Sequence, residues 1–424
     1  MKTSFGISAL MNLRSALNWL AGSAGRAFVF IFILAFGFRA YSWIKNPPLL
    51  PSPDRELGAI AQSLAEAGQF ADPYLIETGP TAHLPPVPPT ILALVLSLFG
   101  RTWQAGYIFW GFIETTNSLA YAMTPWVAGK LGVGKQAGFI AGIIGAFIKE
   151  PYCTHGEGLA AILLGLILVS FLKRWSNERN SLFGSLMLGL GIGASFHVQP
   201  VLLLVFLGCI AFEIGWRRIN RKFVMSGMLA LGVVLACAPW AWRNYTVFHE
   251  FFFIRSNLGL ELRMGNSPGA SATFEEMDRQ GRVYKHPRAS IEEARKVQQL
   301  GEMEYMQQAL VDAITWMKKK PAEFLKLTFW RFIHFWFGPL NRSFTSIPVA
   351  ALTFLAILGA RRTLPNLPLP QRILILIPVI TYPLIYYLVA FMPSYRTPMD
   401  WLIFLLAGVG IWQKDGWSLK RDRE

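Results

Sequence analysis

Cysteine and charged residues are both scarce in this chain of 424 residues. Its three cysteines are too few for a disulfide scaffold or a Cys-based zinc module. Charged residues make up 15% of the sequence, against roughly 25% in an average soluble chain. Apolar residues make up 53%, and the mean hydropathy is +0.38. A soluble core cannot bury so much apolar surface, so the composition indicates an all-α polytopic membrane protein.

Ten apolar runs are candidate membrane spans, for which about 20 mostly apolar residues are needed. Several are shorter, which fits tilted helices or helices partly buried by protein. The first run follows basic residues but has no signal-peptide cleavage pattern, so we expect a retained anchor. The runs are roughly Ala27–Ile44, Gln104–Pro125, Ala137–Ile148, Gly158–Leu172, Leu182–Phe196, Val201–Ile214, Phe223–Trp240, Ser346–Gly359, Ile373–Phe391 and Trp401–Trp412.

An eleventh run, Thr90–Phe99, decides the topology. At ten residues it is too short to span, and we expect an interfacial or re-entrant helix. If it does not cross, most Lys and Arg of the short connections fall on one side, which is the cytoplasmic side by the positive-inside rule. Both termini are then cytoplasmic. The net charge of +15 is explained by topology, and no nucleic-acid partner is needed.

Two extracytoplasmic segments are long. The first outer loop, residues 45–103, is rich in proline and belongs to an N-terminal transmembrane module, 1–242. The second, residues 243–342, is predicted to be a mostly helical outer region: Ala289–Lys320 has an amphipathic helical period, and a helix for the membrane surface starts at Pro321. Residues 343–424 hold the last transmembrane helices and a basic cytoplasmic tail.

Two carboxylates, Asp54 and Glu56, follow the first span by about ten residues. An acid after proline commonly caps a helix, and Asp54 could cap one here. A carboxylate held at the membrane surface is also where a general base would act on a lipid-linked substrate. Spacing alone leaves both interpretations open.

Several segments carry a family resemblance. Asp54-x-Glu56 is followed by SLAEAGQFADPY and GPTAHLPPVPP, and later by APWAWRNYTVFHEFFFIRSNLGLELRMGN (Ala238–Asn266) and PSYRTPMD (Pro393–Asp400). The stretch NSLAYAMTPWVAGKL (Asn117–Leu131) is also similar. Together these resemble the GT-C superfamily of membrane glycosyltransferases, of the sort related to protein O-mannosyltransferases (family 39) and bacterial aminoarabinose transferases.

The resemblance implies a bundle of about ten transmembrane helices and an inverting-type transfer of a sugar from a polyprenyl-phosphate donor. The acceptor would be a lipid, glycan or protein at the outer face, in the cell envelope at a bacterial inner membrane. Asp54 maps onto the catalytic base, and Glu56 is assigned to the site with it. No cofactor is required. Relatives have an aromatic residue where this chain has Leu57, and their second-loop acid maps onto Glu150 or Glu157.

Cations that stay charged suit the lipid phosphate. Arg396 is the first candidate, because it stands almost alone in a short outer loop, and Arg255 and Arg243 follow. Interfacial arginines also serve as snorkelling anchors. We further expect a substrate cavity lined by Glu114, Glu157, His155, His83 and Tyr395. Glu114 could instead make a buried hydrogen bond with Asn117.

Three alternatives remain open from the sequence. His155, Glu157, Glu77 and His83 could together hold a divalent metal, although scattered candidates over two loops are a weak pattern. A secondary transporter or lipid-linked-sugar flippase would use Glu114 at mid-membrane, but no paired half-repeats are seen. A catalytically inactive scaffold of the same fold is the third.

Overall fold

The structure, a computed structural model, describes residues 15–53, 55–148, 154–176, 180–215, 222–339 and 343–411. Asp54 and Glu150 lie outside the described residues. Each of the ten predicted runs overlaps a helix, although the run Ile373–Phe391 extends past the end of its helix at Thr381, and the chain is an all-α polytopic membrane protein as predicted. The helices are α2 (Ala24–Lys45), α5 (Trp103–Ala122) with α6 (Thr124–Lys130), α7 (Lys135–Phe147), α8 (Glu157–Ser176), α9 (Leu182–Phe196), α10 (Leu202–Gly215), α11 (Lys222–Phe248), α17 (Ser343–Thr363), α18 (Leu369–Thr381) and α19 (Thr397–Ile411).

Five of these helices are long and apolar enough to cross a membrane by length and composition. Small residues let some neighbours pack with their backbones in contact. Gly189 of α9 faces Gly232 of α11 so closely that a Cβ at Gly189 would lie 2.1 Å from the carbonyl oxygen of Leu229. Any larger side chain there would push these two membrane helices apart.

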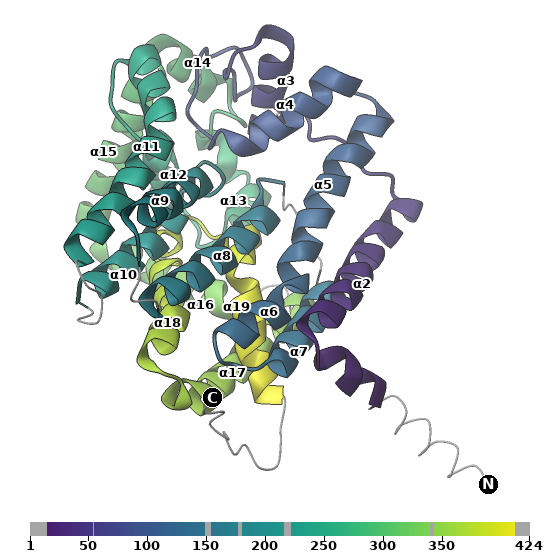
Figure 1. The fold of residues 1–424 in the computed structure, drawn as a ribbon. Helices are drawn as coiled ribbons and strands as arrows, with labels where there is room; N and C mark the ends of the chain where they lie inside the picture. The colour runs from purple at the N-terminus through teal and green to yellow at the C-terminus, as the bar shows by residue number, and fades with distance from the viewer. Residues whose placement is uncertain are drawn as a thin grey trace.

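The predicted non-crossing run forms α4 (Val87–Phe99), a helix of 13 residues. Figure 1 shows α4 running across the upper end of α5, with α3 (Glu56–Ala67) above it. Leu57 and Ile60 of α3 pack on Leu92 and Leu96 of α4 in a small hydrophobic core of their own. This packing fixes the start of α3, where Glu56 lies.

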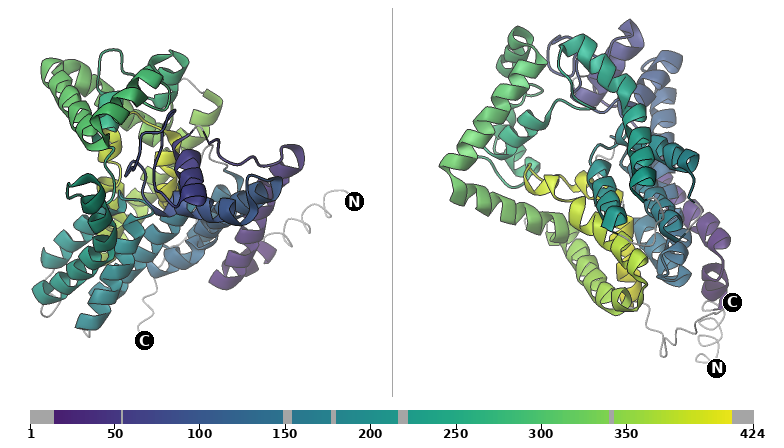
Figure 2. Two further views of the ribbon diagram at one scale, coloured as in Figure 1. Left: turned by 90° about the horizontal axis from the view of Figure 1, so that it is seen from above. Right: turned by 60° about the vertical axis from the view of Figure 1, so that its left-hand side comes forward.

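The outer region consists of α12 (Leu258–Gly265), α13 (Phe274–Arg279), the 3-10 turn η1 (Arg282–Lys285), α14 (Ile291–Leu300), α15 (Glu302–Lys319) and α16 (Pro321–Phe337). The predicted single helix Ala289–Lys320 is wrong in one respect. It is broken at Gly301, whose φ of 80° ends α14 and allows a new start for α15. Pro321 begins α16 as expected, and Figure 2 (right) shows α15 and α16 meeting at a corner.

The outer region shares its core with the first outer loop. Tyr74 from that loop is buried with Leu260, Met277 and Tyr305 of the outer helices, and with Ala390 from the segment before α19. Seen from above, the first-loop segment in purple lies between the green outer helices and the bundle (Figure 2, left). The loop is therefore held between two bodies of the protein, which brings its polar side chains against those of the outer region.

Candidate active site

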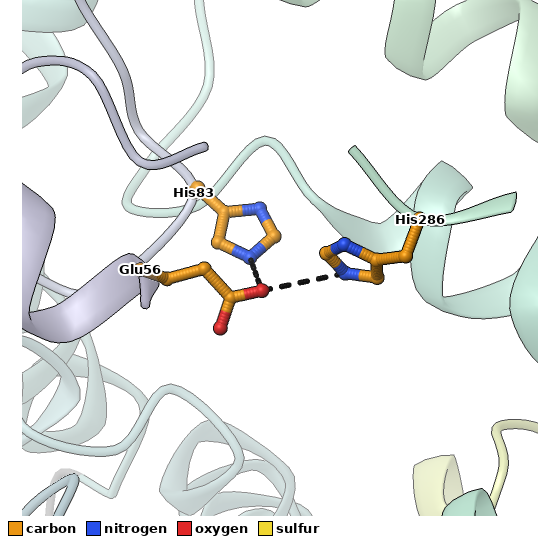
Figure 3. A group of neighbouring side chains, drawn as sticks. All are labelled: Glu56, His83 and His286. Carbon is orange, nitrogen blue, oxygen red and sulfur yellow. Dashed lines mark ion pairs between the residues drawn. The ribbon is translucent and has the colours of Figure 1, made fainter. Parts of the chain in front are cut away.

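Glu56 is the first residue of α3, so its carboxylate lies at the positive end of the helix dipole. Its Oε1 is 3.5 Å from Nε2 of His83 and 3.4 Å from Nε2 of His286, as Figure 3 shows. Its Oε2 lies 3.9 Å from the Arg288 guanidinium. The Glu56 carboxylate thus has three nitrogen-bearing side chains around it. Two of them, His286 and Arg288, belong to the outer region.

The Glu56 carboxylate is ionised. Burial by itself raises the pKa of this group, but the hydrogen bond from His83 and the nearby imidazoles and guanidinium more than offset it. The net pKa of Glu56 lies far below its usual range. His286 is neutral at pH 7, because burial lowers its pKa to about 3 despite the opposing pull of Glu56.

Hydrogen bonds define which nitrogen of His286 carries its proton. The backbone N–H of Arg288 donates to Nδ1 of His286 at 3.2 Å, so in the neutral ring the proton is on Nε2. That N–H points at Glu56 (Figure 3). Nδ1 of His83 lies 3.1 Å from the Tyr74 hydroxyl. Both imidazoles are thereby held by a partner on the nitrogen that faces away from Glu56.

Glu56, His83 and His286 have the ligand types of a borderline divalent cation, one carboxylate and two imidazoles. The separations of 3.4 and 3.5 Å also approach roughly 3.3 Å, the edge of a tetrahedron with zinc-like bonds of about 2.0–2.1 Å. His286 nevertheless does not fit. Its Nε2 carries the proton and so has no lone pair to offer, while its Nδ1 accepts from Arg288. With this tautomer, the triad is a cluster of close polar contacts around the Glu56 carboxylate.

Three more residues predicted for the site lie around this cluster. Arg255 donates from Nε to the carbonyl oxygen of His83 at 2.9 Å, and its two terminal nitrogens have no hydrogen-bond partner among the described residues. His155 is close enough to be influenced by the charges of Glu56 and Arg255, and burial lowers its pKa to about 4. The Tyr395 ring stacks on Tyr386 at 4.5 Å and lies within electrostatic range of Glu56 and Arg255.

The other predicted residues have partners elsewhere. Glu114 pairs with Arg39 and accepts from Asn117, and Glu157 accepts from the backbone of His155 at 2.9 Å. Arg243 donates to the carbonyl oxygens of Thr81 at 2.8 Å and Phe70 at 3.1 Å. Arg396 is buried, 2.5 Å from Asp400, and its remaining contacts reach carbonyls of α16. Of the three predicted phosphate-binding arginines, Arg255 has both terminal nitrogens without a hydrogen-bond partner among the described residues.

Comparisons with known proteins agree with this architecture. No family model matches the chain, and no curated protein matches its sequence. The archaeal oligosaccharyltransferase AglB from Archaeoglobus fulgidus, in complex with an inhibitory peptide and a dolichol-phosphate, is a structural match. It has a TM-score of 0.51 at 14% identity, over 92% of this chain and 50% of that one. The fold is GT-C-like.

Two further solved structures resemble the chain more weakly. A second A. fulgidus oligosaccharyltransferase structure, a complex with Zn and sulfate, gives a TM-score of 0.49 at 13% identity over 91% of this chain and 48% of that one. ArnT from Cupriavidus metallidurans bound to undecaprenyl phosphate gives 0.31 at 12% identity over 93% and 78%. The chain spans about half the length of the two archaeal proteins.

Within this GT-C-like fold, the sequence interpretation missed His286, Arg288 and Tyr74. His286 and Arg288 lie in VYKHPRAS, a polar stretch of the outer region with no interpretable motif. One usable signal was the rarity of histidine: three of the six histidines, His83, His155 and His286, meet at this site. Because the three come from three separate segments, their meeting follows only from the tertiary structure.

Proposed function

We propose that the protein is a membrane glycosyltransferase that moves a sugar from a polyprenyl-phosphate donor to an acceptor at the extracytoplasmic face. The observation that carries the proposal is the convergence on one cluster of an ionised carboxylate, Glu56, and an arginine with unused donors, Arg255. The GT-C-like fold supports it, and the archaeal structure of the same fold is a complex with a lipid phosphate, dolichol-phosphate.

In the proposed reaction, the acceptor hydroxyl oxygen attacks the anomeric carbon while the bond from that carbon to the phosphate oxygen breaks. Asp54, two residues before α3, takes the hydroxyl proton as general base, and polyprenyl phosphate leaves with inversion at the sugar. Arg255 binds the phosphate, since a guanidinium forms paired hydrogen bonds with phosphate oxygens and stays charged. The leaving lipid phosphate needs no nucleotide.

Glu56 has a different role in this proposal. A carboxylate whose pKa is held so low is a poor proton acceptor, but it remains a strong hydrogen-bond acceptor and a fixed negative charge. We infer that Glu56 and its two imidazoles orient the acceptor or sugar hydroxyls, with Tyr395 and His155 on the cavity wall. Arg396 and Arg243 remain predicted phosphate contacts, although each has internal partners, and Arg255 is the stronger candidate.

The transporter alternative relied on Glu114 as a charge free to act at mid-membrane. Its pairing with Arg39 gives that carboxylate a structural partner, which favours the enzyme. In the proposed topology the cluster faces outward and both termini are cytoplasmic.

The test uses the full-length protein in nanodiscs with undecaprenyl-phosphate-linked mannose, glucose or aminoarabinose and an extract of cell-envelope acceptors. We expect release of undecaprenyl phosphate, measured by mass spectrometry, with at least one of these sugars. Asp54→Asn should lower the rate by about 10²–10⁴-fold, the range for loss of a general base. Glu66→Gln, an exposed acid on the same helix α3, is the matched control. Full activity in Asp54→Asn would eliminate Asp54 as the base, and no release with any donor would contradict the proposed function.

A further inference from the structure

Every backbone polar group of the three-residue segment Thr81–His83 has a partner inside the protein, and all three residues are buried. These partners come from four separate parts of the chain. The three N–H groups donate to Phe70 O (from Thr81, 3.0 Å), the Glu302 carboxylate (from Ala82, 2.8 Å) and Thr81 Oγ1 (from His83, 3.0 Å). The three carbonyl oxygens accept from Arg243 (at Thr81, 2.8 Å), Ser256 N (at Ala82, 3.1 Å) and Arg255 (at His83, 2.9 Å). The main chain that carries His83 therefore has no free hydrogen-bonding group.

Glu302 makes the most connections in this set. It is the first residue of α15, follows Gly301, and is 5% exposed. One carboxylate oxygen accepts from Ala82 N at 2.8 Å and from the Ser256 hydroxyl at 2.5 Å, and the other accepts from the Thr81 hydroxyl. A buried carboxylate is costly unless its lone pairs are satisfied, and here three donors and the positive end of α15 satisfy them.

The same carboxylate joins three segments of the site. Thr81 and Ala82 precede His83, which faces Glu56, and Ser256 follows Arg255, the proposed phosphate ligand. Glu302 touches neither Glu56 nor any atom assigned to the reaction. It sets the distance between the segment bearing His83 and the segment bearing Arg255.

We propose that Glu302 is a positioning residue of the active site, acting through Thr81–His83 and Ser256 to hold His83 against Glu56 and to hold Arg255 beside the His83 backbone. Its role in turnover rests on the proposed function. Displacing a catalytic group by about 1 Å can cost roughly 10²-fold in rate, so an anchor of this kind affects the reaction without contacting the substrate. Through Glu302, the outer region thereby contributes to the geometry of the site.

The experiment compares Glu302→Gln with Glu304→Gln, an exposed acid two residues further along α15. Glutamine keeps the shape but offers one acceptor oxygen in place of two, so the Thr81 hydroxyl and the Ala82 and Ser256 donors can no longer all be satisfied. In hydrogen–deuterium exchange of the full-length protein in nanodiscs, we expect the peptide containing Ala82 and His83 to exchange at least about tenfold faster in Glu302→Gln, with no change in Glu304→Gln.

The second arm measures turnover of undecaprenyl-phosphate sugar. We expect Glu302→Gln to lower kcat by about 10–100-fold with the donor KM changed less than about threefold, and Glu302→Asp to fall between it and the wild type. Thr81→Val should lower kcat as well, and the double variant Glu302→Gln/Thr81→Val should be no worse than the more severe single variant, because both break one linkage. If Glu302 only stabilised the fold, kcat of the folded fraction would be unchanged in each variant. The losses of stability in Glu302→Gln and Thr81→Val would then add in the double variant.

The two arms separate the inferences. Unchanged exchange in Glu302→Gln overturns the anchoring, whatever the activity. Faster exchange with an unchanged kcat overturns the positioning role. If the wild type moves none of the sugars, the proposed function has failed, and faster exchange at Ala82 alone would then support Glu302 as the anchor of this segment.

Discussion

The guanidinium of Arg39 and the carboxylate of Glu114 lie 3.4 Å apart, Nε to Oε2, and both side chains are almost fully buried. Arg39 belongs to α2 and Glu114 to α5. Arg39 also donates to the carbonyl oxygens of Gly145, Ala146 and Ile148 at the C-terminal end of α7, at 2.8–3.1 Å. The last carbonyls of a helix lack the usual donor one turn further on, and a cation there complements the helix dipole. One arginine thus ties three membrane helices together.

Removing Arg39 should destabilise the protein more than neutralising Glu114. Arg39→Ala leaves a buried carboxylate unpaired and the end of α7 uncapped, for a loss of about 3–5 kcal/mol. Glu114→Gln keeps an acceptor for Arg39, whose other bonds persist, and should cost about 1–2 kcal/mol. Thermal unfolding in detergent should show the larger fall in Tm for Arg39→Ala, and none for the exposed Lys326→Ala. An equal or larger fall in Glu114→Gln would show that the pair, and not the capping, dominates.

A second buried pair joins α8 to α10. Two nitrogens of Arg174 contact the two carboxylate oxygens of Glu213 at 2.7 and 2.8 Å. Glu213 also accepts from Ser226 of α11 at 2.6 Å. Glu213→Gln should cost about 3–5 kcal/mol, because Arg174 donates to both oxygens of this carboxylate and, unlike Arg39, has no set of backbone carbonyls among the described residues to satisfy it. Ser226→Ala removes one hydrogen bond of the same carboxylate and should cost about 1–2 kcal/mol.

The measurement is again thermal unfolding of the purified protein, with the two variants side by side. Replacing the whole pair with apolar residues, as in Arg174→Met/Glu213→Leu, should restore a large part of the loss, since no buried charge then remains. A double variant as unstable as Glu213→Gln would show that the pair itself, and not the unpaired charge, supplies the stability.

The membrane helices could be predicted because each is encoded by a local apolar run, but the partners of buried charges could not. Arg174 is one of the Lys and Arg residues of the short connections that the positive-inside rule places in the cytoplasm, and it is buried against Glu213. Glu114 was expected either to line a cavity or to bond Asn117, one turn away. Asn117 does bond it at 3.4 Å, yet the main partner, Arg39, comes from another helix. Charge pairing between helices depends on tertiary contacts that no local pattern contains.

In the candidate site, too, some residues could be predicted from local sequence and others could not. Glu56 and His83 were predicted from the first outer loop, His155 from a later short segment, Arg255 from the outer region and Tyr395 from the motif before the last helix. The structure brings all five around one cluster. His286 was not predicted, because the stretch VYKHPRAS around it carries no interpretable motif, whereas Arg255 lies in a segment that carries the family resemblance. Asp54, the predicted base, remains a prediction.

The stability of the protein should fall as the pH is lowered below about 6.5. The pKa of His286 is about 3 in the folded protein, against an ordinary value of 6.5. The unfolded chain therefore takes up this proton first, and the contribution of His286 is complete above pH 6.5 and is lost as the pH falls toward 3. Between pH 6.5 and 5 the loss is about 2 kcal/mol. Glu56, with a lowered pKa, adds a further loss only below about pH 4.5.

His286→Gln should flatten this pH dependence, because glutamine keeps a donor toward Glu56 but does not titrate. The variant would be compared with His249→Gln, whose histidine is exposed. The Tm of each protein would be measured from pH 8 to pH 4.5. As the pH is lowered, the Tm should fall less steeply in His286→Gln than in the wild type or in His249→Gln. A wild-type Tm that stays constant over this range would contradict the neutral, buried state assigned to His286.

Chelation should leave the protein unaffected if the tautomer assigned to His286 is correct. A metal at this cluster would need the Nε2 lone pair, and with it the loss of the hydrogen bond from Arg288 N to Nδ1. We therefore expect EDTA treatment to change neither the Tm nor the rate of release of undecaprenyl phosphate. Zn²⁺ at a roughly 10-fold molar excess over the protein should not raise the Tm, because an ion that does not bind the folded state cannot stabilise it. His83→Gln and His286→Gln would be measured alongside by elemental analysis. Near-stoichiometric zinc in the wild type that is lost in both variants would mean that the His286 ring holds its proton on the other nitrogen, and the cluster would then be a metal centre.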